Sequence, residues 1–64
     1  MGKTLEQKMA EYKNAGLNKD QMSQIRLGYK NGLSDDQVST YAKAEFDWIQ
    51  MEQIRRDLQN FIDS

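Results

Sequence analysis

The sequence predicts an all-α protein, a compact bundle of four short helices packed as angled helical hairpins. Three observations support this prediction. A helix-capping pattern occurs four times, apolar residues repeat at helical spacing between the caps, and a glycine follows each of the first two predicted helices. A chain of 64 residues is long enough for one small core, so we expect a single helical domain over residues 1–64.

The capping pattern is a small polar residue followed three positions later by glutamine. In a capping box the first side chain accepts a hydrogen bond from an N–H of the opening turn, and the glutamine accepts one from the N–H of the cap residue. The four pairs are Thr4 with Gln7, Asn18 with Gln21, Ser34 with Gln37, and Asp47 with Gln50. Three boxes also have the apolar pair of a hydrophobic staple, formed by Leu17 and Met22, Leu33 and Val38, and Phe46 and Met51.

The first two helices are predicted over about residues 5–14 and 19–31. Each has an apolar stripe, made by Leu5, Met9 and Tyr12 in the first and by Met22, Ile25 and Tyr29 in the second. Gly16 and Gly32 can adopt the left-handed conformation that often ends a helix. Gly28 lies inside the second helix, where it costs about 1 kcal/mol relative to alanine, so we expect another backbone to pass close to it.

The last two helices are predicted over about residues 35–44 and 48–62. Their stripes are Val38, Tyr41 and Ala42, and then Met51, Ile54, Leu58, Phe61 and Ile62. Two aspartates, Asp35 and Asp36, open the third helix, where the positive end of the helix dipole favours them. Leu27 and Ile49 lie opposite the stripes of their helices. We expect Leu27 to be buried between two neighbouring helices, and Ile49 to be either buried or part of a binding surface.

The second and fourth helices are predicted to be related by an internal repeat. Residues 18–33 align with residues 47–62 without a gap, and six of the sixteen positions are identical, against roughly one expected by chance. The offset of 29 residues lies within the range of helical repeat units. The third helix is then the connector of a helix-pair unit, and the first helix is the remnant or cap of a preceding unit.

Residues 41–55 carry a resemblance to a known family. Their centre, F-D-W-x-Q-M-E-x-I-R from Phe46 to Arg55, resembles a tandem helical repeat of poorly characterised bacterial and mobile-element proteins. The run from Ile25 to Leu33 is similar to the continuation of that motif. The second copy departs from it at Arg56, Asp57, Phe61 and Ile62, as a terminal copy would. The resemblance spans about residues 17–58; it implies a repeat fold and a mobile-element setting but no activity.

The composition excludes several classes of function. The sequence has no histidine, no cysteine and no phosphate-binding or nucleophile motif, so we expect no enzymatic activity, cofactor, metal site or small-molecule substrate. No stretch is apolar enough to span a membrane, and the first residues lack the apolar core of a secretory signal, which favours a cytoplasmic protein. The net charge of −1 does not favour a general polyanion binder, although residues 18–32 are modestly basic and residues 33–47 modestly acidic.

The remaining hypothesis is a non-enzymatic protein–protein interaction module, of adaptor or inhibitor type, that binds another protein or a second copy of itself. A tryptophan in the first turn of the last helix is a candidate anchor for such a partner. The predicted partner-binding residues are Trp48, Ile49, Glu52, Arg56, Tyr41 and Lys43. Arg26 and Arg55 occupy equivalent positions in the two copies; they either clamp an anionic group of the partner, or cover apolar surface with their stems and pair locally.

The alternative function is a helix-turn-helix DNA-binding domain over residues 24–43. The motif requires apolar and small residues close to the positions of Leu27, Gly28, Gly32, Leu33, Val38 and Tyr41. Its recognition helix would begin with Asp35 and Asp36, however, and phosphates repel carboxylates. Helix–helix packing explains the same spacing, so nucleic acid is not the expected partner.

Overall fold

The structure, a computed structural model, describes residues 2–63, with side chains as far as residue 60. Within these residues it has four helices: α1 (Leu5–Asn14), α2 (Lys19–Lys30), α3 (Asp35–Ser39) and α4 (Trp48–Asp63). The described residues form no strand, so the predicted all-α fold is confirmed. The side chains of Phe61 and Ile62, which the sequence predicts to extend the stripe of the last helix, lie outside the described part.

All four predicted capping boxes are present. In the first three boxes the cap side chain accepts from the backbone N–H of the glutamine, and the glutamine side chain accepts from the backbone N–H of the cap; the cap residues are Thr4, Asn18 and Ser34. The fourth box has the same two hydrogen bonds. At the start of α4, the Gln50 N–H donates to Asp47 Oδ1 at 2.8 Å, and the Asp47 N–H donates to Gln50 Oε1 at 3.0 Å. Gly16 and Gly32 follow α1 and α2 with φ angles of +100° and +95°, a left-handed conformation that glycine adopts without strain.

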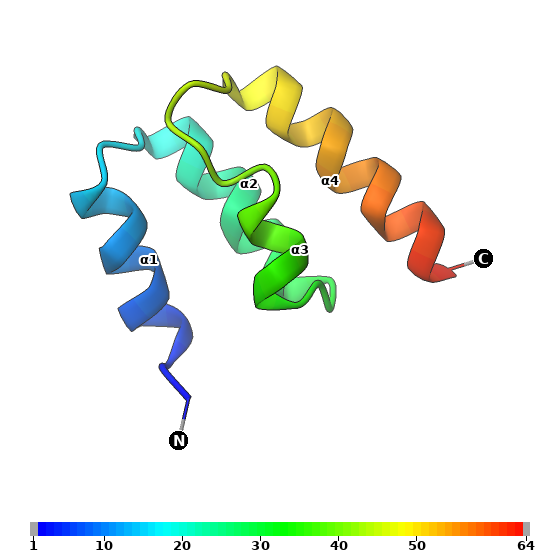
Figure 1. The fold of residues 1–64 in the computed structure, drawn as a ribbon, viewed down its shortest axis with the longest axis horizontal. Coiled ribbons are helices and arrows are strands. Elements are labelled where there is room, and N and C mark those ends of the chain that lie inside the picture. Colours follow the sequence, from blue (N-terminus) through cyan, green and yellow to red (C-terminus); the bar gives the residue numbers. More distant parts are fainter. Residues whose placement is uncertain (1, 64) are drawn as a thin grey trace.

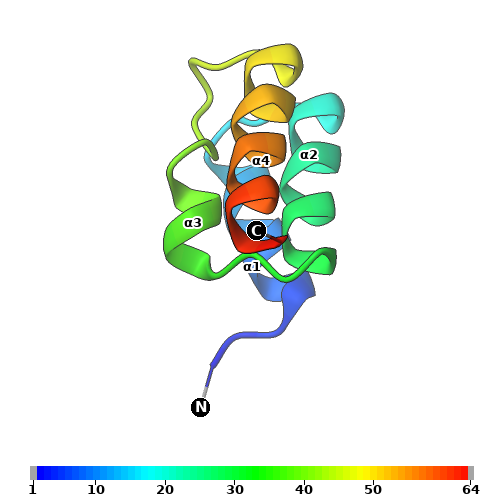
Figure 2. The same cartoon turned by 90° about the vertical axis from the view of Figure 1, so that its right-hand side faces the viewer.

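Successive helices alternate in direction, so α2 and α4 run the same way (Figure 1). α1 and α4 flank α2, and the short α3 lies on the opposite side of the bundle from α2 (Figure 2). The loop of residues 40–47 brings the chain back from α3 to the start of α4. The parallel course of α2 and α4, with a returning helix between them, agrees with the predicted repeat of helix-pair units.

One apolar core joins the helices. Its largest completely buried side chains are Tyr41, Ile25, Met51 and Val38. Met9, Leu17 and Leu33 complete the buried cluster. The half-buried side chains packed against it are Leu5, Tyr12, Met22, Tyr29, Ala42, Phe46, Ile54 and Leu58. As far as the side chains are described, the predicted stripes therefore form the core, together with the residues of the predicted hydrophobic staples.

The third helix is shorter than the predicted range of 35–44, because it ends at Ser39. The hydroxyl groups of Ser39 and Thr40 each donate a hydrogen bond to the carbonyl three residues earlier, at 2.8 and 2.6 Å. Such bonds compete with the backbone N–H groups that would continue a helix. The helix prediction is therefore wrong for residues 40–44, which belong to the loop.

Gln21 holds this loop against the start of α2. Its buried side chain accepts a hydrogen bond from the Asn18 N–H at 2.7 Å through Oε1, as the capping box requires. Its Nε2 donates to the carbonyls of Ala44 and Phe46, at 3.1 and 2.6 Å. The capping pattern predicts the first of these bonds, but not the two that hold the loop.

Gly28 makes room for a side chain and not for the expected backbone. A Cβ atom at this position would lie 2.1 Å from the hydroxyl oxygen of Tyr41 and 3.2 Å from Cδ1 of Leu33. The Tyr41 hydroxyl donates a hydrogen bond to the Gln24 carbonyl at 2.9 Å. The expectation that a backbone passes close to Gly28 is therefore wrong, although the glycine does allow a close approach.

Leu27 is exposed, which contradicts the expectation that two neighbouring helices bury it. It retains 40% of its accessible surface. α1 and α4 lie beside α2, and α3 lies on the inner side of the bundle, so no described helix covers the outer face of α2 (Figures 1 and 2). Leu27 points away from the completely buried Ile25 of the same helix, and therefore towards that open face.

Candidate functional site

Two consecutive apolar side chains begin α4 and are exposed to solvent. Trp48 retains 44% and Ile49 57% of its accessible surface. The capping box formed by Asp47 and Gln50 encloses these two residues and fixes the opening turn of the helix. A large aromatic and a branched aliphatic side chain, held on a capped helix turn, provide the kind of surface that anchors a protein interface.

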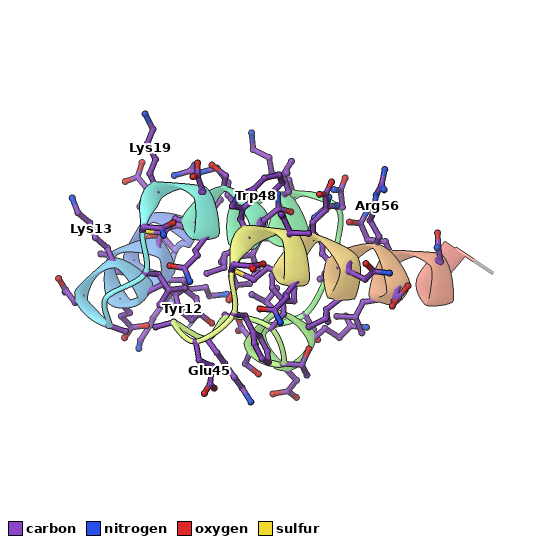
Figure 3. All side chains as sticks on the ribbon, turned by 90° about the horizontal axis from the view of Figure 1, so that it is seen from above. Tyr12, Lys13, Lys19, Glu45, Trp48 and Arg56 are labelled. Carbon is purple, nitrogen blue, oxygen red and sulfur yellow. The ribbon has the colours of Figure 1, made fainter. Side chains whose placement is uncertain are left out.

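Ile49 lies beside two of the charged residues predicted for the site. Glu52 and Arg56 follow it along α4, one and two turns further on. A shallow hollow of about 290 Å³ is lined by Ile49, Glu52, Gln53, Arg56, Asp57 and Asn60. Figure 3 shows Trp48 and Arg56 pointing to the same edge of the molecule. The structure therefore brings four of the predicted residues together on α4.

The other two predicted residues do not join this surface. Tyr41 is completely buried, and its burial raises the pKa of its phenol to about 12. Lys43 lies in the loop before α4, with its Nζ 5.8 Å from the centre of the Phe46 ring. This loop runs along the edge of the molecule that Glu45 marks in Figure 3, opposite to Trp48. Tyr41 is therefore a core residue, and Lys43 belongs to another face.

Arg26 and Arg55 are equivalent in the repeat but have different surroundings. Arg55 retains only 9% of its accessible surface, and its Nε donates a hydrogen bond to Gln24 Oε1 at 2.9 Å. Its Nη1 also donates to Gln59 Oε1. Arg26 is exposed on α2. The two guanidinium groups do not share a site. Arg55 bonds locally to Gln59, as the structural interpretation of the sequence expects, and also links α4 to α2, which the sequence did not predict, whereas Arg26 faces solvent.

A polar cluster joins α1, α2 and α3. Asp35 Oδ1 accepts hydrogen bonds from Lys8 Nζ at 2.9 Å and from the Tyr29 hydroxyl at 2.8 Å. These hydrogen bonds lower the pKa of the Asp35 carboxyl, and the bond from Lys8 has the larger effect. The pKa of the Tyr29 hydroxyl is raised, mainly by burial and then by hydrogen bonds with Tyr12 and Asp35. Because these groups bind one another, the cluster holds helices together. In the described part of the chain, no group of acidic side chains fits a metal ion.

A groove between α1 and α2 was not predicted from the sequence. It has a volume of about 490 Å³ and is lined by Met9, Lys13, Leu17, Lys19, Met22, Ser23 and Arg26. The apolar lining residues form its floor, and every charged lining residue is a cation. The basic excess of residues 18–32 was a signal for this surface. Lys13 comes from another helix, however, and only the fold places it with the others.

Comparisons with known proteins give no family for this chain. No protein-family model matches it, and searches of curated proteins and of solved structures found no significant match. The resemblance to the tandem helical repeat therefore stays a prediction. None of the described helices is long and apolar enough to cross a membrane. A small helical fold alone does not define a function, so the surface of the molecule has to indicate one.

Proposed function

We propose that this chain is a non-enzymatic protein–protein interaction module, of adaptor or inhibitor type, that binds another protein or a second copy of itself through the start of α4. The observation that carries the proposal is the exposure of Trp48 and Ile49, side by side on a capped helix turn. Tryptophan is enriched among the residues that dominate interface energies, and adjacent apolar area excludes water from such an anchor.

The charged neighbours complete this surface. Glu52 and Arg56 place both signs of charge beside Ile49, which suits a polar rim that orients a partner. The apolar area is small, so the expected interface belongs to the transient class. The cytoplasm is the proposed compartment, and a role in a mobile element is supported by the sequence resemblance alone.

The direct test compares partner capture by the wild type and by a Trp48→Ala/Ile49→Ser variant. Leu27→Ser is the matched control, because Leu27 is a similarly exposed apolar residue on α2. A protein captured from cell extract and then purified should bind the wild type and the control alike, and bind the α4 variant about tenfold more weakly or worse. Equal binding by all three folded proteins contradicts the proposal.

Light scattering distinguishes a foreign partner from a second copy. If the partner is a second copy, the molecular mass of the wild type rises with concentration and that of the Trp48→Ala/Ile49→Ser variant does not. Trp48 is the one tryptophan of the sequence, so its emission reports burial of this surface directly. A blue shift on binding is expected for either partner, because the indole leaves water.

The alternative, DNA binding over residues 24–43, has less support. Its recognition helix would be α3, which has five residues and opens with Asp35 and Asp36. A helix so short and acidic is poorly suited to the major groove, where cations neutralise phosphates. Titration with duplex DNA across a salt series tests the alternative. Micromolar or tighter binding that falls steeply with salt would favour it over the protein-interaction proposal.

A further inference from the structure

We propose that the groove between α1 and α2 is a second docking site, which binds an acidic peptide segment that carries a large apolar side chain. The groove has a volume of about 490 Å³, and its lining combines apolar side chains with lysine and arginine. None of its lining residues belongs to the surface around Trp48. The inference therefore goes beyond the proposed function and does not depend on it.

The floor of the groove is apolar and recessed. Met9 and Leu17 retain only 4% and 6% of their accessible surface, and Met22 is half-buried. Methionine is unbranched and polarizable, so two methionines beside a leucine adapt to the shape of an incoming side chain. A floor at this depth is reached by a single projecting side chain, such as leucine or phenylalanine.

The charged residues of the groove are all cations. Lys13 from α1 and Lys19 and Arg26 from α2 line it, and all three are exposed. Among the side chains of residues 2–60, the ion pairs are Lys3 with Glu11 and Lys8 with Asp35, so none involves a cation of the groove. Lys13 and Lys19 point to the same edge of the molecule in Figure 3. Carboxylates on both sides of an apolar anchor complement this arrangement.

The geometry favours a peptide over other anionic partners. A nucleic acid backbone carries phosphates but no apolar side chain to fill the floor, and the chain as a whole has a net charge of −1. An anionic bilayer is flat, and a protein that inserts into it presents projecting apolar side chains, whereas Met9 and Leu17 are recessed. Of these three partners, only a peptide supplies negative charge and a projecting apolar group together.

The probe is the synthetic peptide Ac-EELFEE-NH₂, titrated into protein labelled with ¹³C at the methionine methyl groups. Met9 and Met22 line the groove, and Met51 is completely buried elsewhere and serves as an internal control. We expect saturable shifts of the Met9 and Met22 methyl signals, none at Met51, and a Kd on the order of 100 μM, since the contact area is small. Binding should weaken as salt screens the charges.

Two control peptides separate the contributions of charge and of the apolar anchor. Ac-QQLFQQ-NH₂ keeps the anchor without the carboxylates, and Ac-EEAAEE-NH₂ keeps the carboxylates without the anchor. Each is expected to bind at least about fivefold more weakly than the probe, because each lacks one half of the complementarity. Equal binding of either control peptide overturns the proposal.

Protein variants locate the site. Lys13→Gln, Lys19→Gln and Arg26→Gln should each weaken binding about threefold, a typical effect of removing one exposed charge, while Lys30→Gln on the same helix should not. The Trp48→Ala/Ile49→Ser variant should bind the probe as the wild type does, so failure of the proposed function and failure of this inference are distinguishable. The proposal is overturned if duplex DNA or phosphatidylserine vesicles shift the methyl signals of Met9 and Met22 more strongly than the peptide does. It is also overturned if the peptide causes no saturable shifts.

Discussion

The hydroxyl group of Tyr41 occupies the space that a side chain at position 28 would need. A Cβ atom on Gly28 would lie 2.1 Å from the hydroxyl oxygen. The ring is completely buried, and its hydroxyl is held by the hydrogen bond that it donates to the Gln24 carbonyl. Tyr41 therefore fixes how closely the segment after α3 approaches the middle of α2, and Gly28 is required for that contact.

We expect Gly28→Ala to lower the free energy of unfolding by about 1–3 kcal/mol, because overpacking against a buried group exceeds the gain in helix propensity of about 1 kcal/mol. Urea unfolding, followed by circular dichroism, measures the change. In a Tyr41→Phe background the oxygen is absent, and the alanine should cost about 1 kcal/mol less than in the wild type. Additive effects of the two substitutions would show that the hydroxyl is not the obstacle.

Gln21→Glu tests the attachment of the 40–47 loop to α2. Glutamate can still accept the hydrogen bond from the Asn18 N–H, but it cannot donate to the carbonyls of Ala44 and Phe46. Two partly buried hydrogen bonds are lost and a carboxylate faces two carbonyl oxygens, so the free energy of unfolding should fall by about 2–4 kcal/mol. Urea unfolding at neutral pH measures this loss.

Gln50→Glu is the matched control for that variant. Gln50 is the repeat equivalent of Gln21 and makes the same capping box with Asp47, but it is exposed. The free energy of unfolding should change by less than about 0.5 kcal/mol. A similar loss in both variants would mean that the capping box, and not the loop attachment, is sensitive to the substitution.

The fold was predictable where short-range interactions determine it. A capping box joins residues three positions apart, so residues close together in the sequence determine where α1, α2, α3 and α4 begin. The apolar stripes, which repeat with the period of a helix, predict the core. The end of α3 was not predictable in this way. The hydroxyl bonds of Ser39 and Thr40 that compete with the helix are local, but the loop that residues 40–44 form instead is held by Tyr41 and Gln21, whose partners lie more than fifteen positions away along the chain.

The surface was predictable only in part, for the same reason. Trp48, Ile49, Glu52 and Arg56 lie on one helix, so their proximity follows from helical geometry. Burial of Tyr41 depends on the arrangement of separate helices, which local spacing does not give. The groove between α1 and α2 likewise combines side chains from two helices, and its one signal in the sequence was an excess of basic residues in the second of them.

Asp35 should make the stability depend on acid pH. Its hydrogen bonds with Lys8 and Tyr29 lower the pKa of its carboxyl below the ordinary value of 3.8, so the folded state binds this proton more weakly than the unfolded state. The resulting contribution to stability is fully present above about pH 4 and is lost as the pH falls through the folded-state pKa. Thermal unfolding of wild type and Asp35→Asn between pH 2 and 7 measures it.

Asp36→Asn is the control for this pH dependence. Asp36 shares the first turn of α3, and hence the helix dipole, but it forms no ion pair among the described side chains. The difference in melting temperature between wild type and Asp35→Asn should be largest at neutral pH and should shrink towards pH 2. For Asp36→Asn we expect a smaller difference at neutral pH. An equal effect of both variants would assign the pH dependence to the dipole and not to Lys8.

Arg55→Lys tests the link between α4 and α2. The nearly buried guanidinium donates to Gln24 and to Gln59 from different nitrogens, and a lysine ammonium cannot reproduce that planar pair of hydrogen bonds. We expect the free energy of unfolding to fall by about 1–3 kcal/mol, since hydrogen bonds to a charged group are among the stronger ones. The matched control is Arg26→Lys, the equivalent substitution on the exposed face of α2, which should change it by less than about 0.5 kcal/mol. Urea unfolding measures both changes. If the two variants have the same free energy of unfolding, Arg55 contributes through the contacts of its alkyl stem, which lysine keeps. The hydrogen bonds to the two glutamines would then add little to the packing of α4 on α2.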